Sequence, residues 1–246
     1  MRIVAVYNIK GGVGKTTTAA NLSYHAALHN YSTLLLDLDP QGAVSYYFRV
    51  KPHKKFSSEK FLKGKKIQKF IRGSDYENLD VLPSDLSYRH MELLLSGKKR
   101  SRRQLRRILM PVKNEYDLIV LDCPPNITIV AENIFRASDL ILIPVIPTTL
   151  SMLTYSSLKK FFKDNELNSN HLKPFFSMVE KRKKMHSDII QKSIEKTPDV
   201  FCNTHIPYNS SVEKMGIHRE PVHCFAPRTS GARAFTKLWK EVELIL

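Results

Sequence analysis

Asn8-Ile9-Lys10-Gly11-Gly12-Val13-Gly14-Lys15-Thr16-Thr17 is the stretch of this sequence that decides its fold. It follows a short apolar run at residues 2–7 and precedes an alanine-rich segment with the periodicity of a helix. Glycines let backbone N–H groups turn inward around phosphate oxygens, and the start of a helix adds a favourable dipole. Lys15 is expected to reach the β- and γ-phosphates of a nucleotide, and the Thr16 hydroxyl to ligate Mg²⁺. The sequence therefore predicts a phosphate-binding loop between a strand and a helix.

The loop departs from the ordinary GxxxxGK[ST] pattern at its first position. Ile9 stands where that pattern has glycine, and a second lysine, Lys10, precedes Lys15 by five residues. The alternative interpretation is a chance glycine-rich turn. A Gly-Lys-Thr sequence in register, with a strand before it and a helix after it, argues against that alternative.

Further apolar runs follow the loop and are nearly continuous rather than alternating. They predict strands at residues 33–37, 79–82, 116–122, 140–145 and 175–179. Helical patterns lie between them, for example at residues 102–109 and 153–162, and residues 44–78 are expected to be mostly helical. Strands that alternate with helices at this spacing predict an α/β fold with a doubly wound, mostly parallel sheet. No linker or internal repeat divides the chain, so a single domain, residues 1–246, is expected.

Carboxylates follow two of these runs. Asp37 and Asp39 end the second expected strand, and Asp122 ends the apolar run 118–122. An apolar strand that ends in aspartate is typical of the Walker B arrangement, in which the carboxylate holds Mg²⁺ through water. Cys123-Pro124-Pro125 then predicts a stiff turn facing the γ-phosphate. Any one of these aspartates alone could be a helix cap or a simple strand end, so the inference rests on the three motifs in this order.

With these motifs the sequence resembles the ParA/MinD group of ATPases, which share a deviant Walker A loop. The resemblance rests on KGGVGKTT at 10–17, DLDPQG at 37–42 and LIVLDCPP at 118–125, and the segment 206–232 also looks like ParA. It implies a P-loop NTPase of the deviant Walker A type that uses ATP and Mg²⁺. It also implies an ATP-dependent homodimer in which two subunits face each other across two nucleotides.

The resemblance further implies roles for individual residues. Lys10 would cross the interface to the partner's nucleotide and act in catalysis with Lys15 and Asp39, the last by positioning the attacking water. Thr17 would contact the α-phosphate, and Met178 and Pro207 would lie near the adenine. Nucleotide binding is expected at Lys10, Gly11, Gly12, Val13, Gly14, Lys15, Thr16, Thr17, Met178 and Pro207. Metal binding is expected at Thr16, Asp37 and Asp122.

The charge balance points to a polyanionic partner. The 246 residues include 39 Lys and Arg but 23 Asp and Glu, a net charge of +16. Basic residues cluster at 49–72, 98–107 and 181–184. Each cluster alone could be a solvated face, but three together favour a surface that binds a polyanion, either nucleic acid or an anionic membrane. The ParA resemblance implies that the partner is double-stranded DNA, bound without sequence preference through its phosphates. The residues expected to bind DNA are Arg102, Arg103, Lys181, Arg182, Lys183, Lys184, Lys214 and Arg219. The loop after Ile206-Pro207, which often carries a DNA-binding arginine in ParA relatives, reads Tyr208-Asn209-Ser210-Ser211 here.

The C-terminal segment separates the ParA-like interpretation from its main alternative, a MinD-like positioning ATPase that associates with membrane. Apolar residues in this segment share one helical face: Phe235, Leu238, Trp239, Val242 and Ile245. A membrane anchor prefers a Lys/Arg-rich polar face, whereas Glu241 and Glu243 lie here. We therefore expect this helix to pack on the domain, with no stable membrane insertion and a cytoplasmic, nucleoid-associated protein.

Other classes with the same loop need cysteines that this chain lacks. Its cysteines, at 123, 202 and 224, form no CxxC and do not match a nitrogenase-type iron protein or an iron–sulfur carrier. The start of the chain turns polar at residue 8 and lacks the pattern of a secretory signal. A binding scaffold with a degenerate loop is disfavoured by the intact Lys15, Thr16, Asp39 and Asp122. The expected partner is a ParB-like or cargo-adaptor protein that stimulates hydrolysis. The sequence does not name the cargo.

Overall fold

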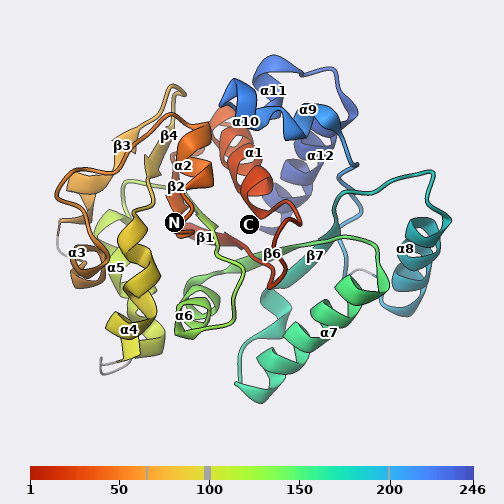
Figure 1. Cartoon of the computed structure of the whole chain (residues 1–246), viewed down its shortest axis with the longest axis horizontal. Helices are drawn as coiled ribbons and strands as arrows, with labels where there is room; N and C mark the ends of the chain where they lie inside the picture. The colour runs from red at the N-terminus through yellow and green to blue at the C-terminus, as the bar shows by residue number, and fades with distance from the viewer. Residues whose placement is uncertain (65, 97–100, 199) are drawn as a thin grey trace.

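The fold is a parallel sheet between two layers of helices in a computed structural model that describes residues 1–64, 66–96, 101–198 and 200–246 (Figure 1). Within these residues the strands are β1 (Arg2–Val6), β2 (Thr33–Asp37), β3 (Arg72–Gly73), β4 (Leu79–Leu82), β5 (Leu118–Asp122), β6 (Leu140–Val145) and β7 (Leu172–Phe176). The helices are α1 (Lys15–Leu28), α2 (Ala43–Tyr47), α3 (Ser58–Lys63), α4 (Met91–Ser96), α5 (Gln104–Leu109), α6 (Ile129–Ala137), α7 (Thr149–Asp164), α8 (Lys184–Lys196), α9 (Ser210–Glu213), α10 (Met215–His218), α11 (Val222–Phe225) and α12 (Ser230–Ile245). Short 3₁₀ turns lie at Ile67–Phe70, Leu86–His90, Ser101–Arg103, Met110–Val112 and Ser169–His171.

The strands lie in the order β3-β4-β2-β5-β1-β6-β7. Every neighbouring pair is parallel except β3 with β4, which is antiparallel at the sheet edge. The central strands β2, β5 and β6 are buried along their whole length and almost entirely apolar, because helices cover both of their faces. The doubly wound, mostly parallel α/β fold is therefore confirmed.

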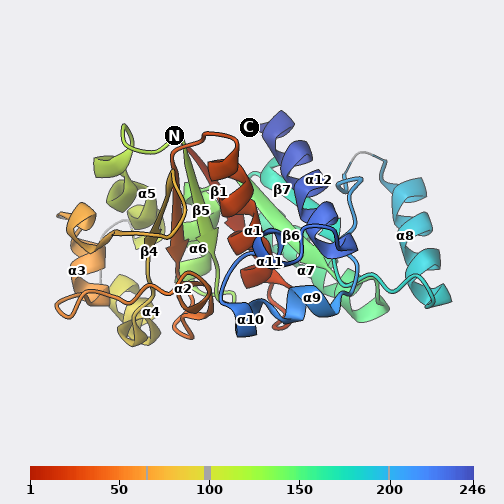
Figure 2. The same ribbon diagram turned by 90° about the horizontal axis from the view of Figure 1, so that it is seen from above.

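Side chains alternate between the two faces of the sheet and form a core on each. Ile3 and Ala5 of β1 belong to the core with α5, α6 and α7, whereas Val4 and Val6 belong to the core with α1 and α12. Figure 2 shows these two layers on either side of the sheet, with α8 beyond its β7 edge. Phosphate-loop and aspartate side chains at the carboxyl ends of β1, β2 and β5 consequently gather at one edge.

Most expected elements are found, and the differences have local causes. Strands 33–37, 79–82 and 140–145 match β2, β4 and β6, but the strand expected at 175–179 lies at Leu172–Phe176. The backbone of Met178 has a positive φ of 53°, which is incompatible with a continuing strand. The segment 44–78 is only partly helical and contains β3, which the sequence analysis missed. The helix expected at 102–109 begins as a 3₁₀ turn, and that expected at 153–162 extends over Thr149–Asp164.

The C-terminal helix packs on the domain as expected. The side chains of Phe235, Leu238, Trp239 and Val242 in α12 are buried in the core that also contains α1. Ile245 was expected on the same face but is 46% exposed, because it lies at the very end of the helix. In the described part of the chain no helix combines the length and apolarity needed to cross a bilayer.

Candidate active site

Two glycines give the phosphate loop its shape. Gly12 and Gly14 have φ angles of 69° and 94°, in the left-handed region that other residues avoid. A Cβ at Gly14 would also lie 3.1 Å from Ser177 Oγ, at the end of β7. Both positions therefore favour glycine for backbone conformation, and Gly14 favours it for space as well.

The loop leads directly into α1, and no side chain caps the N-terminus of this helix. Gly14 occupies the cap position, and the first turn carries no acidic residue. Unpaired N–H groups and the positive end of the helix dipole make such a terminus an anion site. This geometry fits the phosphates of a nucleotide. Thr17 is less free, because its hydroxyl donates to Gly14 O at 3.1 Å.

The two lysines of the loop lie in different directions. Lys15 is only 7% exposed, and its ammonium donates to the Lys10 carbonyl oxygen at 2.9 Å. Burial lowers the pKa of Lys15, while the charges of Asp122, Cys123 and Asp39 oppose that effect. The Lys10 ammonium instead donates to Ser151 Oγ, at 3.3 Å, at the start of α7. One lysine thus lies inside the loop, and the other contacts the start of the neighbouring helix α7.

The sheet brings two aspartates directly together. Asp37 of β2 and Asp122 of β5 are register partners on adjacent parallel strands, and Val6, which precedes the loop, pairs with Asp122 on the other side. Asp37 is fully buried and accepts hydrogen bonds from Ser45 N at 2.9 Å, Ser45 Oγ at 2.6 Å and Asp39 N at 3.2 Å. Burial raises the pKa of Asp37 to about 6, and the bonds from Ser45 limit the rise.

Asp122 is a carboxylate of the site whose oxygens lack hydrogen bonds from the described residues. Its side chain is fully buried, and neither carboxylate oxygen has a hydrogen-bond partner among the described residues. Burial, followed by repulsion from Asp37, raises the pKa of Asp122 well above its usual value, and Thr16 and Lys15 oppose that rise. A buried, orphaned carboxylate is costly unless a cation or a proton compensates it.

These residues fit a magnesium ion. Thr16 and Asp122 provide the oxygen ligands that Mg²⁺ prefers, and Asp37 lies beside them. No cluster of three or more His, Cys, Asp or Glu side chains within the described ranges could hold a metal by itself. Mg²⁺ itself keeps several waters and is usually shared between one or two carboxylates and nucleotide phosphates. When bound, the ion would neutralise charge on the phosphates.

Asp39 is less buried than Asp37 and Asp122. One of its carboxylate oxygens accepts from Gln41 N at 2.9 Å, and its carbonyl oxygen accepts from Ser84 Oγ at 2.5 Å. Its second carboxylate oxygen takes part in none of the hydrogen bonds of the described residues, so the geometry leaves it free to accept from water. Cys123, next to Asp122, is fully buried, and burial raises the pKa of its thiol, so it is no nucleophile.

The two residues expected near the adenine lie next to each other. Val179, directly after Met178, forms a parallel bridge with Pro207, and Val179 N donates to Ile206 O at 3.0 Å. Pro207 also lines a cavity of about 1580 Å³ whose other walls come from α8 and α12. The phosphate loop does not line that cavity, so the cavity is separate from the phosphate site.

Comparisons with known proteins agree with the motifs. A family profile described as an AAA domain matches residues 1–174. The chromosome-partitioning ATPase Soj of Treponema pallidum is 30% identical, with 96% of this chain and 94% of the relative covered. The sporulation initiation inhibitor protein Soj of Bacillus subtilis is 29% identical over 98% of each chain. The chain belongs to the ParA/MinD family of ATPases. Membership makes it an ATPase.

The fold also matches solved members of this family. The septum site-determining protein MinD of Pyrococcus horikoshii, complexed with Mg-ADP, superimposes with a TM-score of 0.80 at 22% identity, covering 99% of this chain and 96% of that one. At this identity the likeness supports the fold of a ParA/MinD ATPase.

The residues expected to bind DNA do not form one patch on this ParA-family chain. Lys214 and Arg219 border α10, on the α1 side of the sheet, whereas Arg102 and Arg103 precede α5 on the other side. Lys181, Arg182, Lys183 and Lys184 lie exposed at the start of α8. Two of the eight residues already have acidic partners: Lys183 Nζ lies 2.6 Å from Glu180, and Arg102 Nε lies 3.1 Å from Glu132. Residues 65 and 98–100 of the basic clusters lie outside the described residues.

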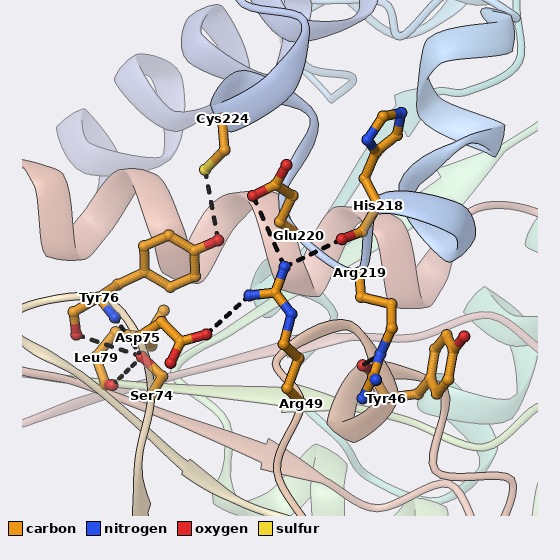
Figure 3. Close-up of polar contacts among 10 residues, drawn as sticks. All are labelled: Tyr46, Arg49, Ser74, Asp75, Tyr76, Leu79, His218, Arg219, Glu220 and Cys224. Atoms are coloured by element: carbon orange, nitrogen blue, oxygen red, sulfur yellow. Dashed lines mark hydrogen bonds and ion pairs between the residues drawn. The ribbon is translucent and has the colours of Figure 1, made fainter.

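Arg219 belongs to a network that the sequence analysis missed (Figure 3). Its Nε donates to Tyr46 O at 3.1 Å, and its guanidinium lies 4.4 Å from the centre of the Tyr46 ring. Arg49 lies beside it and bonds to Asp75 at 2.8 Å and to His218 O at 3.1 Å. These contacts join α2, which carries Ser45, to the segment around α10.

Sequence reasoning also missed the side chains that hold the site in shape. Asn8 donates to Pro144 O at 2.8 Å and accepts from Lys10 N at 2.9 Å, so it fixes the start of the phosphate loop. Ser45 and Ser84 hold Asp37 and Asp39. Asn8 directly precedes the loop and could have been suspected from that position, whereas nothing in the local sequence distinguishes the two serines.

Proposed function

We propose that this ATPase, acting as a single domain over residues 1–246, forms an ATP-dependent homodimer that binds double-stranded DNA without sequence preference. It associates with the nucleoid and positions a cargo, which is a plasmid, a chromosome or a protein assembly. A ParB-like or cargo-adaptor protein stimulates its hydrolysis of ATP. The relatives named as a chromosome-partitioning ATPase and as Soj support this assignment.

The orientation of Lys10 is the observation that carries the proposal. Its ammonium lies against Ser151 of α7 instead of inside its own phosphate loop, where Lys15 already lies. A second cation beside the site is therefore available to the nucleotide of a partner subunit. Charge that develops on a transferring phosphoryl group is stabilised by such additional cations. Dimerisation and hydrolysis are thus coupled through one side chain.

Within each subunit we assign the remaining roles from the family resemblance, and the positions of the side chains are compatible with them. Lys15 and the N–H groups from Gly11 to Thr17 hold the phosphates, and Thr16 and Asp122 hold Mg²⁺ with support from Asp37. Asp39 positions the attacking water with its exposed carboxylate oxygen. Met178 and Pro207 border the adenine.

DNA binding is supported by the net charge of +16 and by the exposed basic residues. A monomer neutralises only the phosphates that its own patches reach. A dimer brings two copies onto one duplex, so the second contact becomes intramolecular and the affinity rises. The apolar face of α12 is buried, which disfavours the MinD-like alternative because an amphipathic anchor must offer that face to lipid.

Duplex binding by the full chain tests the proposal, measured with ATP and with ADP at two salt concentrations. Each phosphate neutralised adds about −0.9 to the slope of log K against log salt, so the ATP form should give the steeper slope. Random and specific duplexes should bind alike. Equal affinities and slopes with ATP and ADP would refute the nucleotide switch, and binding to anionic liposomes instead would favour the MinD-like function.

Charge reversals then locate the DNA surface. Lys181→Glu with Arg182→Glu should weaken DNA binding while ATP-dependent dimerisation persists, because both side chains are exposed in the loop before α8. Lys159→Glu with Lys160→Glu, on exposed positions of α7, makes the same change in net charge and serves as the matched control. An equal loss in both double variants would mean that overall charge, and not this loop, governs binding.

A further inference from the structure

A cavity of about 530 Å³ lies away from the phosphate loop, between α5, the end of α6 and the residues that precede β7. Arg136 and Ala137 end α6 just before β6 begins, and Glu166 to His171 lead into β7. Segments that precede parallel strands lie at the amino ends of those strands. The cavity therefore lies at the opposite edge of the sheet from the nucleotide site, on the side of α5 and α6.

Four arginines line this cavity: Arg103, Arg106, Arg107 and Arg136. The first three share one face of α5 and the turn before it, because their spacing of three and four residues matches a helical turn. Glu166 is the acidic residue among the lining side chains. The cavity wall therefore carries a clear excess of positive charge.

These guanidinium groups are poorly neutralised by the protein. Arg106 lies 3.7 Å from Asp139, and within the described residues the other three form no ion pair. Arg107 donates to Gln104 Oε1 at 2.7 Å and Arg136 to Asn165 O at 3.3 Å, both neutral acceptors. Like charges held this close repel one another, so the arrangement favours an added anion.

Arg136 provides a second, independent indication. Its Nε is buried and has no hydrogen-bond partner in the part of the chain that the structure describes. Buried donors in folded proteins are nearly always paired, with protein, water or ligand. The Arg136 guanidinium also lines the cavity, so an anion there would add acceptors to a group whose Nε lacks one.

We propose that the cavity binds a small anion carrying two or more phosphate groups. Guanidinium groups match phosphate oxygens bidentately, and several of them suit a multiply charged anion better than a single carboxylate. The volume lies within the range of about 300–1,000 Å³ that small-molecule sites occupy. A DNA duplex presents its phosphates on a convex surface, which a concave cavity of this size does not fit. Phe135, Met110 and Leu167 add apolar wall for an organic group on the phosphates.

Calorimetric titration of the full chain tests this site. Because the phosphate loop also binds phosphates, the titrations use a Lys15→Ala background without Mg²⁺. One arm uses inorganic pyrophosphate and the other thymidine 5′-diphosphate. Binding in both arms supports the site. If thymidine 5′-diphosphate binds more tightly than pyrophosphate, the apolar wall contacts the organic group of the ligand. If the two bind equally, the site recognises the phosphates alone.

Arginine variants test whether pyrophosphate binds in this cavity. Arg103→Gln and Arg107→Gln, both at exposed positions, should each weaken pyrophosphate binding about tenfold, as expected for loss of a charged hydrogen bond. Arg102→Gln is the matched control, because Arg102 pairs with Glu132 and does not line the cavity. It should leave pyrophosphate affinity unchanged.

Three results would overturn the proposal. Failure of the Lys15→Ala chain to bind pyrophosphate would place all phosphate binding in the phosphate loop. Equal weakening by Arg102→Gln would indicate general surface charge. Weaker duplex binding by Arg103→Gln and Arg107→Gln, in a chain that binds no pyrophosphate, would assign the arginines to a DNA surface.

Discussion

Replacement of Ser45 by alanine tests how the site keeps a buried carboxylate ionised beside Mg²⁺. The Ser45 hydroxyl donates to Asp37 Oδ2 at 2.6 Å and accepts from Ser84 N at 3.0 Å. Ser45→Ala removes the hydroxyl but keeps the backbone N–H of residue 45, which donates to the same carboxylate at 2.9 Å. The change therefore removes one of two bonds from residue 45 and creates little space.

The size of the effect follows from the charge of the acceptor. A hydrogen bond to a charged group contributes about 1.5–3 kcal/mol, and about 1.4 kcal/mol corresponds to one pKa unit. Burial raises the pKa of Asp37 to about 6. Loss of the Ser45 hydroxyl should raise this pKa further, by roughly 1–2. The sign is upward because the lost bond stabilises the ionised form. At pH 7 the carboxyl of Asp37 would then be at least half protonated.

The pH dependence of ATP hydrolysis at several Mg²⁺ concentrations measures this shift. In Ser45→Ala the acid limb should move to higher pH by about one unit or more, with more Mg²⁺ needed at pH 7. Activity should recover toward pH 9, where Asp37 is ionised again. Thermal unfolding without nucleotide checks that the variant is folded.

Ser84→Ala is the matched control for Ser45→Ala. Ser84 Oγ donates to the Asp39 carbonyl oxygen and not to a carboxylate, so its loss should leave the acid limb in place. An unchanged acid limb in Ser45→Ala, or an equal shift in both variants, would refute the role given to this bond.

Three further predictions concern catalysis, dimerisation and stability. Asp39→Ala should hydrolyse ATP ~10²–10⁴ times more slowly and accumulate as an ATP-bound dimer, and normal turnover would exclude Asp39 as the water-positioning group. Lys10→Ala should bind ATP but sediment as a monomer, since Lys15 provides the nucleotide contacts within the subunit. A variant that forms a normal dimer and hydrolyses ATP at the normal rate would contradict the action of Lys10 on the partner's nucleotide. Burial, then repulsion from His223 and His29, lowers the pKa of His25 from 6.5 to about 4, so the unfolded chain binds more protons than the folded one between those pH values. His25 should therefore lower the free energy of unfolding by about 2–3 kcal/mol from pH 7.5 to 4.5, measured by urea unfolding as the difference between the pH dependence of the unsubstituted chain and that of His25→Gln; the same pH dependence in both proteins would rule out this role of His25.

The nucleotide site was largely predictable because it is built from the ends of parallel strands. Asp37 and Asp122 are 85 residues apart in sequence, yet any parallel sheet that pairs their strands brings both carboxylates to one edge. The phosphate loop needs only local sequence, since its glycines and the following helix determine its conformation. The apolar runs and the aspartates at their ends therefore carry this part of the prediction.

Features that depend on packing between distant segments were not predictable. The strand expected at 175–179 lies earlier because the backbone turns at Met178. The cavity arginines come from α5 and α6, and the loop before β7 completes the wall, so their proximity depends on helix packing that no local pattern encodes. Charge clustering in the sequence indicated a polyanion near residues 102–107, but it did not distinguish the paired Arg102 from the unpaired Arg103.

Helix α2 connects two features that the sequence analysis treated as separate. Ser45 bonds to Asp37 at the magnesium site, and the next residue, Tyr46, holds Arg219, which we expect to contact DNA. Both contacts lie on one helix of five residues, which is too short to bend between them. A displacement of α2 on nucleotide binding would therefore either carry Arg219 with it or strain the Tyr46–Arg219 contact. Because Arg49, just beyond the same helix, bonds to Asp75 and to His218 O, such a displacement would also pull on the segment around α10. The nucleotide site thus has a direct mechanical connection to one of the basic residues proposed to contact DNA, through adjacent residues and without a long chain of contacts.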